Sequence, residues 1–188
     1  MSALPVRSAA MPNYDINEVE GAFRDYWTKG ATGEDWDAWS DLFTEDVEYI
    51  EHVLGSKHGR EEVRSWIKPI MAEFGEMYTA YEWHVCEPNG RIVVYMQNRR
   101  DNPDPNGPPI DFPGMTVLQY AGGGKFSLEE DFWSLVEGQR TMKEYEEACA
   151  KHDPDAPKKR TRRNWGNGPS WTKGAATYAE SAGAKKGA

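Results

Sequence analysis

Residues 42–52 read LFTEDVEYIEH, and residues 59–67 read GREEVRSWI after a short connection. The first stretch predicts the end of a helix followed by a strand, and the second predicts the start of an amphipathic helix. Because successive side chains of a strand point to opposite faces, Val47, Tyr49 and Glu51 share one face. Apolar and aromatic side chains in line with a carboxylate indicate a cavity wall that holds one charged group. The exposed edge of a surface strand would give the same pattern.

The composition predicts one domain with an aromatic core. The chain has 188 residues, of which 38% are hydrophobic and 28% charged, and it contains 8 Trp, 9 Tyr and 6 Phe. Its two cysteines, Cys86 and Cys149, predict no disulfide framework. No apolar run reaches 18 residues, and residues 1–13 lack the apolar core of a signal peptide. We therefore expect a reduced, cytoplasmic protein without membrane contact.

The charge of the chain is unevenly distributed. The whole sequence has 22 basic and 31 acidic residues, and residues 151–188 hold 9 of the bases but only 3 of the acids. The first 150 residues therefore hold 13 bases and 28 acids. An acidic domain of this kind argues against a nucleic-acid partner. The basic tail instead suits an acidic surface of its own chain or of a neighbouring subunit, on which Trp165 and Trp171 would dock.

The hydrophobic pattern predicts helices first and then mostly strands. Helices are expected over residues 16–29, 34–42, 60–74 and 141–151, and strands over residues 47–54, 81–87, 91–100, 115–120 and 125–133. Segregated strands and helices indicate an α+β fold, with a curved antiparallel sheet wrapped around the N-terminal helices. The expected organisation is a lead-in over residues 1–13, a domain over residues 14–152 and a basic irregular tail over residues 153–188.

Three landmarks together resemble a known family. Residues 39–46 run into the first strand, residues 59–63 (GREEV) open a helix, and residues 123–126 (GGKF) lead to residues 129–133 (EEDFW). Their order resembles the SnoaL-like branch of the nuclear transport factor 2-like superfamily, over roughly residues 15–150. This branch includes ketosteroid isomerases, limonene-epoxide hydrolases, scytalone dehydratases and polyketide cyclases. The resemblance implies a cone-shaped α+β barrel with a deep pocket, a homo-oligomer (dimer or trimer), and often no metal or organic cofactor.

The resemblance also suggests site residues by position. Glu51 lies near the general base of the isomerases, Phe23 near their oxyanion tyrosine, and Thr116 near their protonated aspartate. Phe23 has no hydroxyl and Thr116 no carboxyl group, so this resemblance does not fix the reaction.

The epoxide hydrolase pattern is matched in part. Asp131 lies near the acid that these enzymes carry on the last strand. Gln97 and Arg99 lie near their arginine and aspartate, so that pair is not reproduced.

Two carboxylates are the leading catalytic candidates. An inward-facing Glu51 in an aromatic pocket would have a raised pKa and could act as a general base or acid, whereas at an exposed strand end it would face water. Asp131 shares a strand face with Glu129 and Trp133, and opposite Glu51 it would form an acid and base pair with separated pKa values. The alternative is that residues 129–131 are a solvated acidic run.

Other side chains are candidates for binding the substrate. Tyr95, Gln97 and Arg99 alternate along one strand and are expected to face inward, where Tyr95 could donate to an oxyanion and Arg99 could bind a carboxylate. The alternative for Arg99 is an exposed strand end. Trp27 and Trp39 recur at helical spacing and are expected to line the core and the pocket floor.

These features lead to two functional hypotheses. The first is a cofactor-independent enzyme that isomerises, dehydrates, cyclises or opens an epoxide in a hydrophobic cyclic, terpenoid-like or polyketide-like compound. Glu51 and Asp131 would carry protons, and Tyr49 would orient the substrate. The second is a non-catalytic module of the same fold that binds a ligand or oligomerises. No metal is expected, because the histidines His52, His58 and His84 lack the spacing of metal ligands.

Overall fold

The computed structural model describes residues 12–177. Its elements follow in this order: α1 (Ile16–Trp27), the π-helical turn η1 (Thr28–Thr32), α2 (Trp36–Ser40), β1 (Phe43–Glu51), β2 (Lys57–His58), α3 (Arg60–Glu73), β3 (Tyr78–Cys86), β4 (Arg91–Arg100), β5 (Ile110–Gly122), β6 (Lys125–Trp133), α4 (Leu135–His152), α5 (Ala156–Lys159) and the 3-10 turn η2 (Ser170–Thr172). None of the helices within this range combines the length and apolar character needed to cross a membrane.

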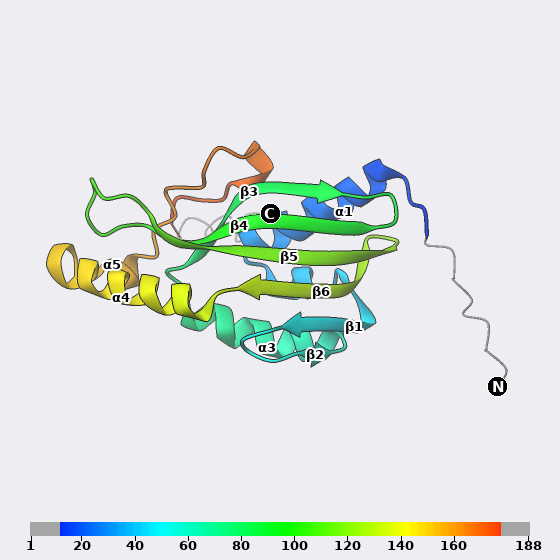
Figure 1. Ribbon diagram of the computed structural model, residues 1–188, viewed down its shortest axis with the longest axis horizontal. Helices are drawn as coiled ribbons and strands as arrows, with labels where there is room; N and C mark the ends of the chain where they lie inside the picture. The colour runs from blue at the N-terminus through cyan, green and yellow to red at the C-terminus, as the bar shows by residue number, and fades with distance from the viewer. Residues whose placement is uncertain (1–11, 178–188) are drawn as a thin grey trace, which may run out of the picture.

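The predicted α+β class is confirmed, but the sheet is open rather than a closed barrel. Its six strands follow the order β2-β1-β6-β5-β4-β3, so β2 and β3 are its two edges (Figure 1). The pairing of β1 with β6 is parallel, whereas the other neighbouring strands are antiparallel. The predicted antiparallel sheet is therefore corrected only at this one pair of strands. The long connection between β1 and β6 allows this parallel pairing, which a hairpin would not.

One face of the sheet is packed against the helices. On β4 and β5 the even-numbered side chains are buried there, among them Ile92, Val94 and Leu118, and they join one core with Val19 and Trp27 of α1. Because a strand alternates its faces, the odd-numbered residues of β4 point to the other side of the sheet. The expectation that Tyr95, Gln97 and Arg99 face inward is thereby overturned. The run of apolar residues at 92–96 has apolar side chains on both faces, so alternation alone could not choose between them.

Two predicted boundaries also differ from the structure. β1 begins at Phe43, four residues before the predicted start, because its first half is irregular and passes a register shift between Phe43 and Glu48. Helix α4 begins at Leu135 rather than near residue 141. Ser134 caps it by accepting a hydrogen bond from the backbone N–H of Glu137, while Thr141 bonds to carbonyl groups inside the helix.

The described part of the basic tail, up to residue 177, docks on its own chain along the β3 edge of the sheet (orange in Figure 1), and the rest of the predicted tail lies outside the described residues. Trp165 packs against Tyr78 of β3, with ring centroids 4.9 Å apart. Trp171 meets Phe23 of α1 and Tyr81 of β3 edge to face. The tail thus contributes to the packed structure of this chain, and a role at a neighbouring subunit stays a prediction.

Candidate active site

A cavity of about 670 Å³ lies between the sheet and helices α1, α2, α3 and α4. This volume is in the range of pockets that bind small organic molecules. Its walls are mainly apolar and aromatic, and they include Trp27, Trp36, Trp39, Trp66, Met71 and Met142. The two tryptophans that the sequence assigned to a pocket, Trp27 and Trp39, therefore do line one.

The polar wall of this cavity is centred on Asp131. The Tyr49 hydroxyl donates to Oδ2 of Asp131 at 2.5 Å, and the Thr116 hydroxyl donates to Oδ1 at 2.5 Å. These three residues come from the neighbouring strands β1, β5 and β6, and the parallel register of β1 with β6 brings Tyr49 beside the acids. Burial raises the pKa of Asp131 to about 6, although the two hydroxyl donors oppose this rise.

Glu129 is the second acid of this wall. It lies two residues before Asp131 on the same face of β6, and its side chain is 2% exposed. The Tyr26 hydroxyl donates to Oε1 at 2.7 Å, while Oε2 has no hydrogen-bond partner among the described residues. Burial, and then the charge of Asp131, raises the pKa of Glu129 well above its usual range. The cavity wall therefore holds two neighbouring acids, both with a raised pKa.

The hydroxyl groups around the acids stay neutral. Burial, followed by the charges of nearby carboxylates, raises the pKa of Tyr26 and of Tyr49 well above the usual value for a phenol. Both groups therefore act as hydrogen-bond donors rather than as phenolates at physiological pH.

Glu51 lines the cavity but is fully occupied by other contacts. Its Oε1 accepts from the Trp133 indole at 2.5 Å, and its Oε2 accepts from the backbone N–H groups of Val53 and Leu54. The side chain is 4% exposed. It closes the turn after β1 and fixes Trp133 against it, so its contacts fit a positioning residue better than a proton carrier.

Replacing Glu51 by Ala is expected to destabilise the protein by about 1–3 kcal/mol, because three partly buried hydrogen bonds lose their acceptor. Glu51→Gln keeps one acceptor oxygen and should cost less. Urea unfolding of both variants measures the effect. Equal stability of native protein and Glu51→Ala would contradict this anchoring role.

Four of the predicted binding residues do not line the cavity. Tyr95 stacks on Trp83 on the other face of the sheet, with ring centroids 5.5 Å apart, and Gln97 shares that face. Arg99 pairs with Asp111 at 2.6 Å and also donates to the carbonyl of Asn164 in the tail, so it anchors the tail.

Phe23, the fourth, lies behind the cavity wall. It is fully buried, and its ring centroid is 4.3 Å from that of His84. Thr116 does line the cavity, where it serves Asp131 as a hydrogen-bond donor.

Sequence reasoning missed Arg100, which also lines the cavity. Its side chain lies over the Tyr145 ring of α4 and donates from Nε to Glu76 at 2.9 Å. Within residues 12–177, its Nη1 has no hydrogen-bond partner although the residue is 1% exposed. Arg100 shares the inward face of β4 with Ile92 and Val94, because even-numbered residues of this strand point inward up to its last residue. Its position on that face is the signal in the sequence that could have identified it. Arg100 therefore places a buried cationic group in the cavity wall.

Sequence reasoning also failed to select Glu129 as a cavity residue, for a different reason. Strand alternation places it on the face of Asp131, but the three consecutive acids at 129–131 were also compatible with an exposed run. In the structure only Glu130 of these three faces away from the cavity, and it pairs with His52 at 2.8 Å.

Solved structures of similar fold include enzymes. An LEH-like epoxide hydrolase from M. tuberculosis is 11% identical, with a TM-score of 0.58, and the match covers 76% of this chain and 96% of that one. A putative polyketide cyclase from Xanthomonas campestris is 15% identical, with a TM-score of 0.54, and the match covers 67% and 97%. TerC, co-crystallised with polyporic acid, is 16% identical, with a TM-score of 0.54, and the match covers 67% and 98%. At these identities the likeness shows the fold alone.

The sequence itself assigns the family. No match was found among curated proteins. The model of the SnoaL-like domain matches residues 22–128, a stretch that runs from α1 through the cavity-lining strands into β6. With more than half of the chain matched and an α+β fold that agrees, the chain belongs to the SnoaL-like domain family.

Proposed function

We propose that this chain is an enzyme that moves protons on a hydrophobic small molecule bound in the cavity, with Asp131 as the base and Glu129 as the acid. Isomerisation, dehydration, cyclisation and epoxide opening all use such a pair, and a cyclic, terpenoid-like or polyketide-like compound suits the aromatic walls. The similar structures described as a polyketide cyclase and an epoxide hydrolase support this class by analogy of fold.

The observation that carries the proposal is the placement of two acids side by side in the cavity wall, each with a raised pKa. Asp131 and Glu129 share one face of β6 and line the same cavity. Asp131, with a pKa of about 6, is ionised at neutral pH, and Glu129, whose pKa burial and the charge of Asp131 raise well above its usual range, is assigned the role of the acid. One carboxyl group is therefore ready to accept a proton, and its neighbour is ready to donate one.

The surrounding groups support this division of roles. The Tyr49 and Thr116 hydroxyls each take one lone pair of Asp131, so they hold its carboxylate in one orientation towards the cavity. Oε2 of Glu129 and Nη1 of Arg100 are enclosed and have no partner within the described part of the chain, so a small shift of either side chain towards the cavity would let a substrate oxygen supply one. Glu51 is proposed here as a positioning residue through its bond to Trp133 rather than as a catalyst.

An activated carbon acid tests the proposal without knowledge of the natural substrate. A nitrobenzisoxazole, which opens when a base removes its ring proton, should be turned over with saturation kinetics. The rate should rise with pH through about 6, because the Asp131 carboxylate is the active form. Saturable binding without turnover would favour the non-catalytic, ligand-binding alternative. A rate that follows free buffer carboxylate would contradict the proposal.

A matched control distinguishes the cavity from its surroundings. Glu130→Gln changes the acid between the two candidates, on the opposite face of the same strand, where it pairs with His52. This variant should retain the native rate and pH profile. A loss of rate equal to that of an Asp131 variant would instead indicate a general effect of β6.

A further inference from the structure

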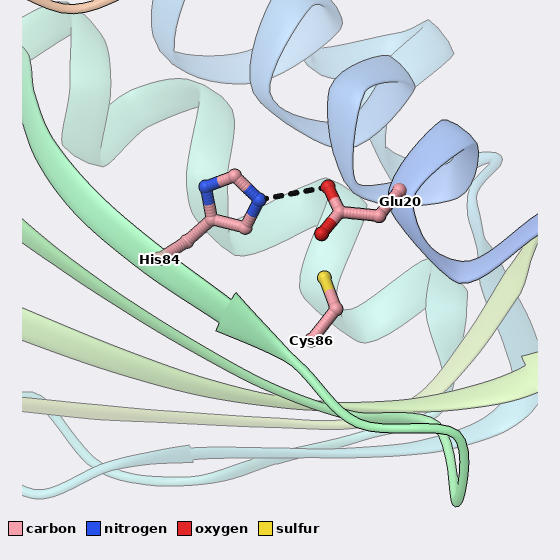
Figure 2. A group of neighbouring side chains, drawn as sticks. All are labelled: Glu20, His84 and Cys86. Atoms are coloured by element: carbon pink, nitrogen blue, oxygen red, sulfur yellow. Dashed lines mark hydrogen bonds and ion pairs between the residues drawn. The ribbon is translucent and has the colours of Figure 1, made fainter. Parts of the chain in front are cut away.

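A second group of polar side chains lies outside the cavity, between α1 and β3. Figure 2 shows Glu20 from the helix facing His84 and Cys86 from the strand. Nε2 of His84 lies 2.9 Å from Oε2 of Glu20. One nitrogen, one carboxylate oxygen and one sulfur of the three residues all lie within 4.8 Å of one another. None of the three lines the cavity, so the proposed acid and base chemistry does not use them.

A local irregularity of β3 assembles this group. The register with β4 shifts between Tyr81 and Trp83, and after the shift the even-numbered residues face α1. His84 and Cys86, two residues apart, therefore share the face that meets Glu20. Tyr81, which lies before the shift, comes to the same side, and its hydroxyl lies 2.8 Å from Nδ1 of His84.

The histidine is held with its Nε2 aimed at the group. Its ring packs at a tilt against Phe23 with a centroid distance of 4.3 Å, and the Tyr81 hydroxyl lies beside Nδ1. An outer hydrogen bond of this kind fixes the ring orientation of a metal-ligating histidine, and it leaves Nε2 as the coordinating atom.

A nucleophilic cysteine does not explain the arrangement. Nε2 of His84 meets the carboxylate of Glu20, so it is not the base of a Cys–His pair. Burial, and then the charge of Glu20, raises the pKa of the Cys86 thiol to about 12, which opposes formation of a free thiolate. The alternative without a metal is an ion pair between His84 and Glu20, with the Cys86 thiol hydrogen-bonded to the same carboxylate.

We propose that Glu20, His84 and Cys86 bind a divalent transition metal of the zinc type. Carboxylate oxygen, imidazole nitrogen and thiolate sulfur are the three donor types that zinc takes in proteins, at about 2.0–2.3 Å. On binding, Cys86 releases its proton to solvent, and His84 coordinates through Nε2 as the neutral tautomer that carries its proton on Nδ1 and donates it to the Tyr81 oxygen. Three protein ligands leave the fourth tetrahedral position for water. The sequence pattern did not reveal this site, because Glu20 comes from a distant helix.

Cobalt provides a direct readout, since a cobalt–thiolate bond absorbs light at wavelengths where the protein does not. Metal-free native protein titrated with Co²⁺ is expected to develop this thiolate band with one ion per chain, and Zn²⁺ should displace it. Cys86→Ser should lose the band, and Glu20→Gln should keep it with weaker binding. Tyr81→Phe should weaken binding by about 10–100-fold, as removal of an outer partner typically does.

The second cysteine provides the matched control. Cys149 packs against Tyr145 and Ile110 in another cluster, so Cys149→Ser should leave the cobalt spectrum unchanged. Circular dichroism confirms that each variant is folded before titration. Absence of a thiolate band in the native protein, or a band that survives in Cys86→Ser, would overturn the proposal. Turnover in the cavity is measured separately, so failure of this site leaves the proposed enzyme function untouched.

Discussion

Replacing Asp131 by Asn is expected to lower turnover in the cavity by about 10²–10⁴-fold, the usual contribution of a positioned general base. The amide is close to the carboxylate in shape and still lies beside Tyr49 and Thr116, so binding should change much less than turnover. The measurement is kcat and KM for the benzisoxazole probe or for any substrate that is identified. A fall in kcat with a similar KM identifies the loss of a group that acts in the transition state.

Asp131→Asn should also raise the free energy of unfolding relative to the native protein as the pH approaches neutrality. Asp131 has a folded-state pKa of about 6 against an ordinary value of 3.8, so between these values the unfolded chain binds fewer protons than the folded one. The free energy of unfolding therefore falls as pH rises from about 4 to 6, and the ionised side chain costs stability above that range. The amide of the Asp131→Asn variant cannot ionise, so the variant avoids this cost.

Thermal or urea unfolding at two pH values tests the sign. The stability of the variant relative to the native protein should improve by about 2 kcal/mol between about pH 4.5 and about pH 7.5. Glu130→Gln, on the opposite face of β6, provides the control. An Asp131→Asn variant with native turnover would remove Asp131 from the mechanism. A relative stability that is the same at both pH values would show that its pKa is not raised.

Truncation of the chain after Lys159 is expected to destabilise the domain by about 3–5 kcal/mol or more. It removes Trp165, which is 7% exposed against Tyr78, and loss of a buried aromatic side chain alone typically costs about that much. It also strips partners from Asp101, a buried carboxylate that accepts from the Asn164 side chain at 2.7 Å and from the backbone N–H of Arg163 at 2.8 Å. A buried charge without its partners adds to the loss.

Urea unfolding compares the truncated chain with point variants. Trp165→Ala should reproduce a large part of the loss, whereas Lys173→Ala, an exposed position of the same segment, should have little effect. Loss of several kcal/mol is a large fraction of the total stability of a domain, so the truncated chain should also unfold at a clearly lower temperature. Unchanged midpoints in the truncated chain would mean that the tail is only loosely attached in solution.

The sequence predicted most of the fold because its elements carry strong local signals. The helix that starts at Arg60 and the strands β4 and β6 lie at or within one residue of their predicted starts. The shared face of Tyr49 and Glu51 followed from alternation alone. The sequence could not predict which strands become neighbours, and the parallel pairing of β1 with β6 is what brings Tyr49 to Asp131.

The site was harder to predict because the inner face of several strands is not evident from their residues. β4 has apolar residues on both faces, so the sequence prediction placed the face with Arg99 inward, and the structure places Arg100 in the cavity wall. The shift in β3 after Tyr81 changes which residues face the helices, and it decides where His84 points. Glu129 could have been predicted as a site residue, because it shares its strand face with Asp131. The sequence alone does not show whether an acid on that face is buried or exposed.

Carboxyl-carbon NMR of the native protein across a pH titration tests the central claim most directly, with Asp131→Asn and Glu129→Gln used to assign the two signals. We expect the signal lost in Asp131→Asn to titrate near pH 6, and the signal lost in Glu129→Gln to remain that of a neutral carboxyl group at neutral pH. If both signals titrated together in the ordinary range of exposed acids, near about pH 4, the two groups would not form an acid and base pair, and the proposed chemistry would be wrong.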